Sequence, residues 1–330
     1  MQATFERSPP LRRSTLSITS LALCLCALAA FAAACGSSGD DDSEDLYEGV
    51  PPPAEDRSEH PWKIVVSMPI FADFAREMAG NQAVVTTLIP IGVDPHTYEP
   101  TEDQIAAIQE ADIVFVNGSG LDDPTIDFIE RNRPDRRFFV VDFVRNIPSP
   151  THQQPVDQPI YAKDVGDDPH LYLDPVLVPV YVETVSHSLI IVDGLNESYY
   201  DGRFRRYKER LGALHTMMTE ELGRIPAENR EAIVMPHNSL IHLARRYGLK
   251  VSATLADDGE SGVRDFLAAN PNAVAFEETG RDDGGVLGAL ATETGATVCN
   301  VHTDTIDDEG MSYLEMMEYD TAELADCLGG

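Results

Sequence analysis

The alternation of short apolar runs with helical stretches constrains the fold most strongly. Helical spacing of apolar residues at 70–79 ends at Gly80, and a second helix is predicted at 101–110. Strands that alternate with helices indicate a parallel α/β sheet. Four apolar runs of strand length surround these helices, at 63–67, 83–89, 112–118 and 138–141.

The same alternation returns in the second half of the chain. The helical pattern of 196–223 separates the halves, and no strand follows it until Ile233. We interpret this pattern as a helix that connects two lobes; an ordinary surface helix of one domain is the alternative. The predicted fold is therefore α/β, with parallel sheets flanked by helices in an N-terminal lobe (62–195) and a C-terminal lobe (225–330), joined by a long helix (196–224). The strands of the second lobe are predicted at 232–235, 251–255, 273–276 and 296–301.

The first 35 residues have the pattern of an export signal. Arg12 and Arg13 precede an apolar run from Leu16 to Ala34, which ends in small residues directly before Cys35. This order predicts a bacterial lipoprotein signal, in which a lipid on Cys35 anchors the mature chain outside the cytoplasm at the cell membrane. A permanent transmembrane span is the alternative, because the run is near the length of about 18 apolar residues that a span requires.

Acidic residues dominate both the segment after Cys35 and the whole chain. Residues 36–61 contain the run 40–45 and almost nothing apolar, so we expect a disordered acidic tether. The remainder, about 270 residues, is enough for two compact domains. The formal net charge of −32 disfavours nucleic acid and anionic lipid surfaces as partners.

Two cysteines follow Cys35, namely Cys299 and Cys327. Outside the cytoplasm an even pair permits a disulfide, and we favour that interpretation. Two buried thiols are the alternative. Metal ligation by thiolate is disfavoured, because the sequence has no Cys-x-x-Cys spacing.

The sequence Asp-Pro-His, followed by one spacer and Tyr, occurs at 94–98 and again at 168–172. Proline fixes its own φ and biases the preceding residue towards extended geometry, so stiff turns present His96 and His170. A stiff turn suits a ligand, because little freedom remains to be lost when a metal binds. Neutral imidazole is a common metal ligand. Two capped turns that happen to hold histidine are the alternative.

Two further candidate ligands follow predicted strands of the second half. His237 lies in a Pro-His turn after the strand at 232–235, and Asp304 follows the strand at 296–301. Ligands of parallel sheets gather beyond the carboxyl ends of strands. Three imidazoles and one carboxylate suit a divalent transition metal such as zinc. For Asp304 an exposed acidic run through 307–309 is the alternative. The candidate ligands are therefore His96, His170, His237 and Asp304.

These motifs resemble those of the metal-binding receptors of ABC importers, the cluster A-I, ZnuA- and TroA-like family that takes up zinc or manganese. The resemblance runs from Ile64 to Leu328 and is carried by 92–100, 168–175, His237 with 243–249, and Thr303-Asp304. It implies two α/β lobes joined by a rigid helix, with the metal between them. His96 and His170 would be the ligands of the first lobe, and His237 and Asp304 those of the second.

The resemblance also implies a function. The chain would be a lipid-anchored, extracytoplasmic receptor, not an enzyme, that delivers its ion to a membrane permease with a cytoplasmic ATPase. Histidine at 237 favours zinc over manganese, because a carboxylate there would favour manganese. Zinc receptors often have a His-rich loop before the second ligand, whereas 148–167 holds only His152, which weakens the case for zinc.

Several nearby side chains have open roles. His302 stands where the family usually has Tyr, so it is a candidate rival or partner of Asp304. Glu277 and Glu278 are candidates to accept hydrogen bonds from imidazole N–H groups, or they are solvated. The remaining histidines are expected at the surface without a role: His60, His152, His187, His215 and His242.

Two other functional classes compete. A zinc hydrolase needs an open coordination position and a nearby base. Four protein ligands leave no open position, and the sequence has no His-Glu-x-x-His motif. A surface adhesin that uses the metal only as a staple stays open as an added role.

Overall fold

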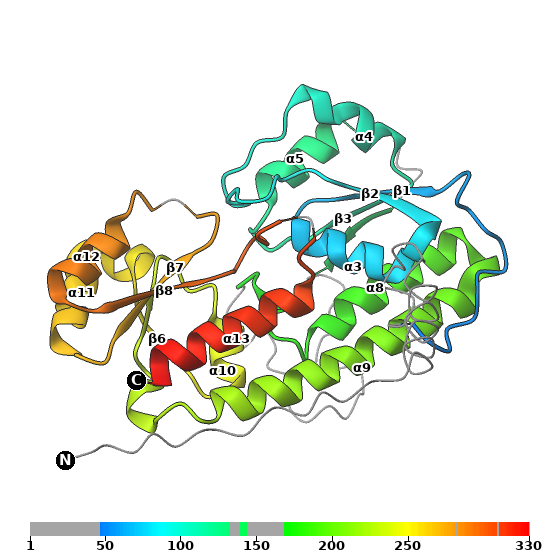
Figure 1. Cartoon of the computed structure of the whole chain (residues 1–330). Helices are drawn as coiled ribbons and strands as arrows, with labels where there is room; N and C mark the ends of the chain where they lie inside the picture. The colour runs from blue at the N-terminus through cyan, green and yellow to red at the C-terminus, as the bar shows by residue number, and fades with distance from the viewer. Residues whose placement is uncertain (1–46, 133–138, 144–167, 282, 309, 330) are drawn as a thin grey trace, which may run out of the picture. The chain divides into compact units, whose positions relative to one another are not determined.

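Two four-stranded sheets, each entirely parallel among its paired strands, organise the fold (Figure 1). The N-terminal sheet has the order β2-β1-β3-β4, and the C-terminal sheet has the order β6-β5-β7-β8. This architecture confirms the predicted α/β class with two parallel sheets. The strands are β1 (Trp62–Val66), β2 (Ala83–Thr87), β3 (Ile113–Val116), β4 (Phe139–Asp142), β5 (Ile233–Met235), β6 (Val251–Thr254), β7 (Val274–Glu278) and β8 (Thr297–Val301).

The structure is a computed structural model, and it describes residues 47–132, 139–143, 168–281, 283–308 and 310–329. The predicted signal peptide, lipidation at Cys35 and the loop at 148–167 lie outside these residues. Within the described ranges, no helix is both long and apolar enough to cross a membrane.

Helices flank both sheets, and the longest lies between them in the chain. α9 has 26 residues and contacts α3 and α8 of the N-terminal lobe as well as α13, the last helix. Its buried stripe includes Tyr207, Leu211 and Met218 at helical spacing. The helices are α3 (Pro69–Ala79), α4 (Ile105–Glu110), α5 (Asp123–Asn132), α8 (Val178–Val192), α9 (Glu197–Leu222), α10 (Ile241–Arg246), α11 (Leu255–Ala269), α12 (Val286–Thr294) and α13 (Tyr313–Gly329).

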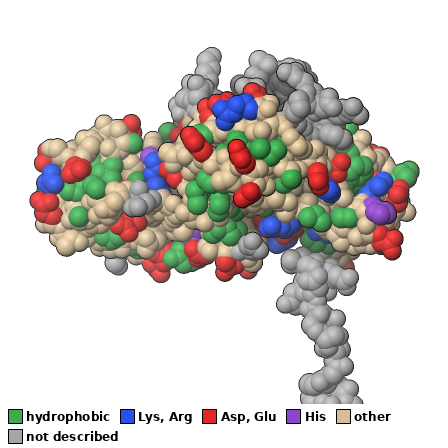
Figure 2. All heavy atoms as spheres, turned by 90° about the horizontal axis from the view of Figure 1, so that it is seen from above, with side chains coloured by type: hydrophobic (Ala, Val, Ile, Leu, Met, Phe, Trp, Pro, Cys, Tyr) green, Lys and Arg blue, Asp and Glu red, His purple; other side chains and the backbone are tan. Residues whose placement is uncertain are grey.

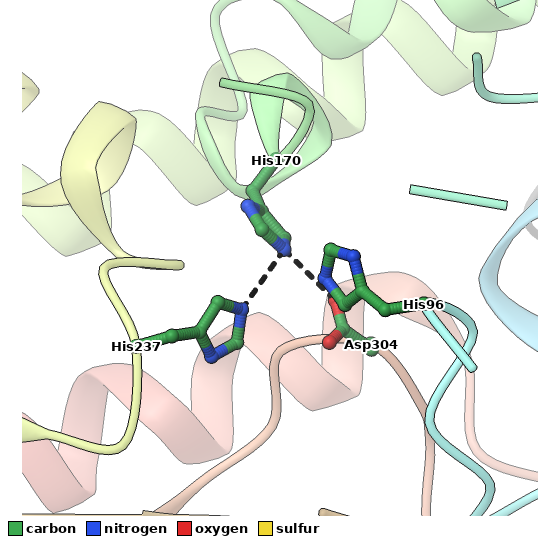
Figure 3. A group of neighbouring side chains, drawn as sticks. All are labelled: His96, His170, His237 and Asp304. Carbon is green, nitrogen blue, oxygen red and sulfur yellow. Dashed lines mark hydrogen bonds and ion pairs between the residues drawn. The ribbon is translucent and has the colours of Figure 1, made fainter. Parts of the chain in front are cut away.

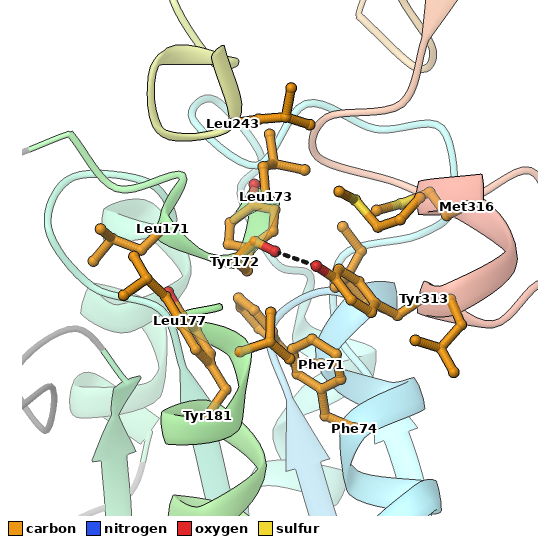
Figure 4. Close-up of a cluster of buried hydrophobic side chains, with 14 of the residues drawn as sticks. Phe71, Phe74, Leu171, Tyr172, Leu173, Leu177, Tyr181, Leu243, Tyr313 and Met316 are labelled. Carbon is orange, nitrogen blue, oxygen red and sulfur yellow. Dashed lines mark hydrogen bonds between the residues drawn. The ribbon is translucent and has the colours of Figure 1, made fainter. Parts of the chain in front are cut away.

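One buried apolar cluster continues from the first sheet to the second. It includes Ile64 of β1, Phe71 of α3 and Phe276 of β7. Figure 4 shows part of this cluster, where Tyr172 and Tyr313 lie beside Phe71 and Phe74. The Tyr313 hydroxyl donates a hydrogen bond to the Tyr172 carbonyl at 2.8 Å. The two lobes therefore share a core on this side, which limits how far they can tilt apart.

The predicted disordered tether at 36–61 extends too far along the chain, because its last part makes specific contacts. Around Glu55 and Arg57 the chain is fixed to the turn between α8 and α9. The Glu55 N–H donates to Asn196 Oδ1 at 2.9 Å, and Arg57 Nε lies 3.1 Å from a carboxylate oxygen of Asp193, which is buried. Hydrogen bonds and an ion pair order a segment that has little apolar surface, and composition alone does not reveal such partners.

Acidic side chains are spread over the surface. On the face shown in Figure 2, Asp and Glu side chains lie scattered among apolar and neutral ones. A dispersed charge of one sign favours solubility through self-repulsion and does not define a site by itself.

A disulfide joins Cys299 of β8 to Cys327 of α13 across 28 positions of sequence. We expect the double variant Cys299→Ser with Cys327→Ser to lose about 3 kcal/mol of unfolding free energy, because a cross-link of this loop length restricts the unfolded chain. Urea titration of both proteins measures the difference. Reduced wild type serves as the control and should match the double variant. Equal midpoints for oxidised and reduced wild type would contradict the prediction.

Candidate metal centre

Four side chains from both lobes converge on one point (Figure 3). One ligand atom from each lies within 4.8 Å of the others in the cluster of His96, His170, His237 and Asp304. His170 Nε2 lies 3.3 Å from His237 Nε2 and 3.3 Å from Asp304 Oδ1. The structure therefore brings all four sequence-predicted ligands together, although they are separated by up to 208 positions (304 − 96) in the chain.

The repeated Asp-Pro-His motif forms the same local structure twice. Asp94 Oδ1 accepts a hydrogen bond from the His96 N–H at 2.9 Å, and Asp168 Oδ1 accepts one from the His170 N–H at 3.0 Å. An aspartate that bonds the backbone two residues later closes a tight turn. The aspartate thus explains why the motif begins two residues before each histidine.

The two turns differ in burial. His170 is 1% exposed, because the short 3₁₀ helix that follows it, Leu171–Leu173, is buried in the shared core. His170 thus lies in the shared core although a turn presents it. His96 is half-buried, but its Nε2 is buried and has no hydrogen-bond partner among the described residues. A buried polar atom without a partner costs about 1–3 kcal/mol, and a metal ion at the centre would satisfy it.

Neighbouring side chains orient the ligands. His237 Nδ1 lies 2.7 Å from Glu278 Oε2, and His170 Nδ1 lies 3.0 Å from Asp168 Oδ1. With the Nδ1 atoms held by carboxylates, both Nε2 atoms are directed to the centre, as in protein metal sites generally. Glu278 is 4% exposed, so it is not solvated and instead accepts a hydrogen bond from the imidazole of His237.

The Tyr172 hydroxyl holds Asp304 in place by donating a hydrogen bond to its Oδ1 at 2.7 Å. Burial alone would raise the pKa of Asp304, but the charge of His170 and the hydrogen bond from it hold that pKa well below its ordinary value. Asp304 is therefore ionised in the folded protein. It is buried at 5% exposure, so the alternative of an exposed acidic run is wrong for this residue.

His170 carries the complementary charge. Burial would lower its pKa, but the charge of Asp304 and hydrogen bonds to Asp168 and Asp304 raise the pKa of His170 to about 10. By contrast, burial lowers the pKa of His96, and the neighbouring histidines lower it further against the opposing charge of Asp304. Without an ion, the site thus holds a protonated His170 beside an ionised Asp304.

His302 is neither a rival nor a partner of Asp304. Its Nδ1 lies 2.9 Å from Asp320 Oδ1 of α13, and its Nε2 lies 3.0 Å from Asp307 Oδ1. β8 ends at Val301, so the chain leaves the strand before His302 and this side chain turns towards α13. It fixes the last helix instead of contributing to the metal cluster.

The expected surface position is wrong for His242. This residue of α10 is 1% exposed, and its Nε2 lies 3.3 Å from the Asp168 carbonyl oxygen. Four residues later Arg246 Nε donates to both carboxylate oxygens of Asp174, at 3.1 and 2.9 Å. The i, i+4 spacing places both side chains on one helix face, and that face contacts Asp168 and Asp174 of the first lobe.

Comparison with known proteins adds independent information. The family model described as ZnuA, zinc-uptake complex component A, periplasmic, matches residues 64–327. The metal ABC transporter substrate-binding lipoprotein SloC of Streptococcus mutans is 27% identical over 80% of this chain and 89% of that protein. The manganese-binding lipoprotein MntA of Halalkalibacterium halodurans is 28% identical over 88% of this chain and 92% of that protein.

Solved structures share the fold. The periplasmic zinc-binding protein TroA from Treponema pallidum superposes with a TM-score of 0.70 and 22% identity, covering 81% of this chain and 99% of TroA. A crystal structure of ZnuA gives a TM-score of 0.68 at 24% identity, covering 81% of this chain and 98% of that one. At these identities the likeness concerns the architecture of two lobes with flanked parallel sheets.

Proposed function

The chain belongs to the family of periplasmic zinc-uptake components, and on that premise we propose that it is an extracytoplasmic receptor for a divalent transition metal. The receptor would bind its ion between the lobes and deliver it to the membrane permease of an ABC importer. The family is one of transport receptors and not of enzymes. Relatives named as lipoproteins support anchoring through Cys35 as part of the same proposal.

The observation that carries the proposal is the convergence of His96, His170, His237 and Asp304 from strand ends and turns of both lobes. A site built from two lobes changes its affinity when the lobes separate, and no chemical step is needed. Four protein ligands also fill a tetrahedral site, whereas a catalytic zinc keeps one position open. The geometry thus favours capture and release over hydrolysis.

We propose zinc as the preferred ion and manganese as the alternative. Three imidazoles with one carboxylate suit zinc, whereas manganese prefers oxygen ligands in an octahedral arrangement. Manganese remains a specific alternative, because MntA and several PsaA relatives are named for it, and YfeA of Yersinia pestis is named for iron.

Protein purified without chelator should contain about one equivalent of zinc per chain, because one set of four ligands forms one site. Elemental analysis gives the content, and competition between zinc and manganese against a chelator of known affinity gives the preference. Tighter binding of manganese would reverse the choice of metal. Absence of tight binding for either ion, or hydrolysis of esters that His237→Ala abolishes, would contradict the receptor function.

A further inference from the structure

Two of the ion pairs that connect the lobes near the metal centre differ in burial. The guanidinium group of Arg246 in α10 makes three contacts of 2.7 to 3.1 Å to the carboxylate oxygens of Asp174. The two side chains are 14% and 1% exposed. Arg281 Nη1, after β7, lies 3.3 Å from Asp94 Oδ2, and these side chains are 26% and 20% exposed. The first pair is part of the shared core, whereas the second pair is less buried and can therefore break at lower cost.

The less buried of the two pairs is connected to two ligands. Asp94 closes the turn that presents His96, through its hydrogen bond from the His96 N–H. Arg281 Nε also lies 3.6 Å from Glu278 Oε2, the oxygen that holds His237 Nδ1. One guanidinium group thus contacts the two carboxylates that orient one ligand from each lobe.

The backbones of the two lobes touch directly beside this pair. Gly280 has φ of +80°, and a Cβ built on it would stand 2.9 Å from Gly92 Cα and 2.8 Å from Thr305 Cγ2. The Gly92 N–H donates to Thr305 Oγ1 at 2.9 Å. Polar and glycine contacts of this kind can separate without exposing a large apolar surface, unlike the core around Tyr172.

The loop that carries His96 also has space on one side. A pocket of about 310 Å³ is lined by Pro90 and Ile91 of this loop and by Ile306 of the other lobe. Tightly packed interiors resist such displacement, whereas a loop beside open space can shift. The ligands His170 and Asp304 cannot shift in this way, because both are buried and the Tyr172 hydroxyl bonds to Asp304.

We propose that Arg281 is a latch, a positioning residue that holds the His96 and His237 edge of the site closed. The cleft opens at this edge, so His96 separates from the ion first while His170 and Asp304 stay together. This inference rests on the proposed function of metal capture. The rate of metal release then depends on how readily the Arg281–Asp94 pair breaks, and not on the Arg246–Asp174 pair.

Stopped-flow release of zinc into an excess of chelator tests the latch. Arg281→Gln should release zinc about fivefold faster with little change in the association rate, because a partly buried ion pair of this kind contributes modestly and acts on dissociation. Arg281→Lys should restore part of the slow release. The matched control is Arg264→Gln, which removes an exposed ion pair with Glu293 in the same lobe and should leave release unchanged. Equal release rates for Arg281→Gln and wild type would overturn the proposal.

Hydrogen exchange of the metal-free proteins separates this inference from the proposed function. Arg281→Gln should speed amide exchange at 91–97 and leave exchange at 171–173 as in wild type, since only the first segment lies at the latch. Equal acceleration in both segments would mean that the site opens on both sides and would overturn the latch. If wild type failed to bind zinc, the proposed function would fail, and the exchange comparison would still decide where the lobes separate.

Discussion

His237→Ala is expected to lower zinc affinity on the order of a thousandfold, because a structural zinc site draws its binding free energy from about four ligands. This histidine is the cleanest ligand to remove. It is half-buried and follows β5, and its buried partner Glu278 keeps the Ser239 hydroxyl as a donor, so its loss leaves the shared core intact. Competition titration against a zinc chelator measures the affinity, and far-UV circular dichroism checks the fold.

His187→Ala provides the matched control, since His187 is an exposed histidine of α8 and lies outside the cluster. His170→Ala should behave differently from both, because it also leaves Asp304 buried without its charged partner. We therefore expect that variant to melt at lower temperature even without metal. An affinity loss below tenfold for His237→Ala would remove this residue from the ligand set.

Much of this site was predictable because its ligands lie in stiff local motifs. The Asp-Pro-His turns specify their geometry within three residues, so His96 and His170 were predictable from sequence. His237 and Asp304 were predictable only because strands end just before them. No local pattern predicts that His242 packs against Asp168 or that Arg281 reaches Asp94, since those contacts join residues far apart in sequence.

The missed strand end at β7 has a physical cause. Apolar periodicity ends at Phe276, but the strand continues through Glu277 and Glu278, which pair with Asn300 and Val301 of β8. A buried carboxylate is tolerated there because His237 and the Ser239 hydroxyl both bond to Glu278. The first turns of helix α11 likewise have no apolar periodicity, because they are polar and depend on the Thr254 cap.

Zinc affinity should fall by about tenfold for each unit of decreasing pH near neutrality, because one proton must leave the site when the ion binds. That proton is on His170, whose pKa is raised to about 10 by Asp304 and Asp168 despite the opposing effect of burial. The lowered pKa of His96 keeps that ring neutral, so it adds no proton near neutrality.

The stability of the metal-free protein and its zinc affinity change in opposite directions with pH. A folded pKa above the ordinary histidine value near 6.5 means that the proton stabilises the metal-free fold fully below that pH, and that this stabilisation is lost as pH rises through about 10. Alkali therefore weakens the free protein while it strengthens zinc binding. Calorimetry at pH 7.5 in two buffers of different ionisation enthalpy counts the protons. Release of about one proton per zinc is expected, and release of none would mean that His170 is already neutral in the free site.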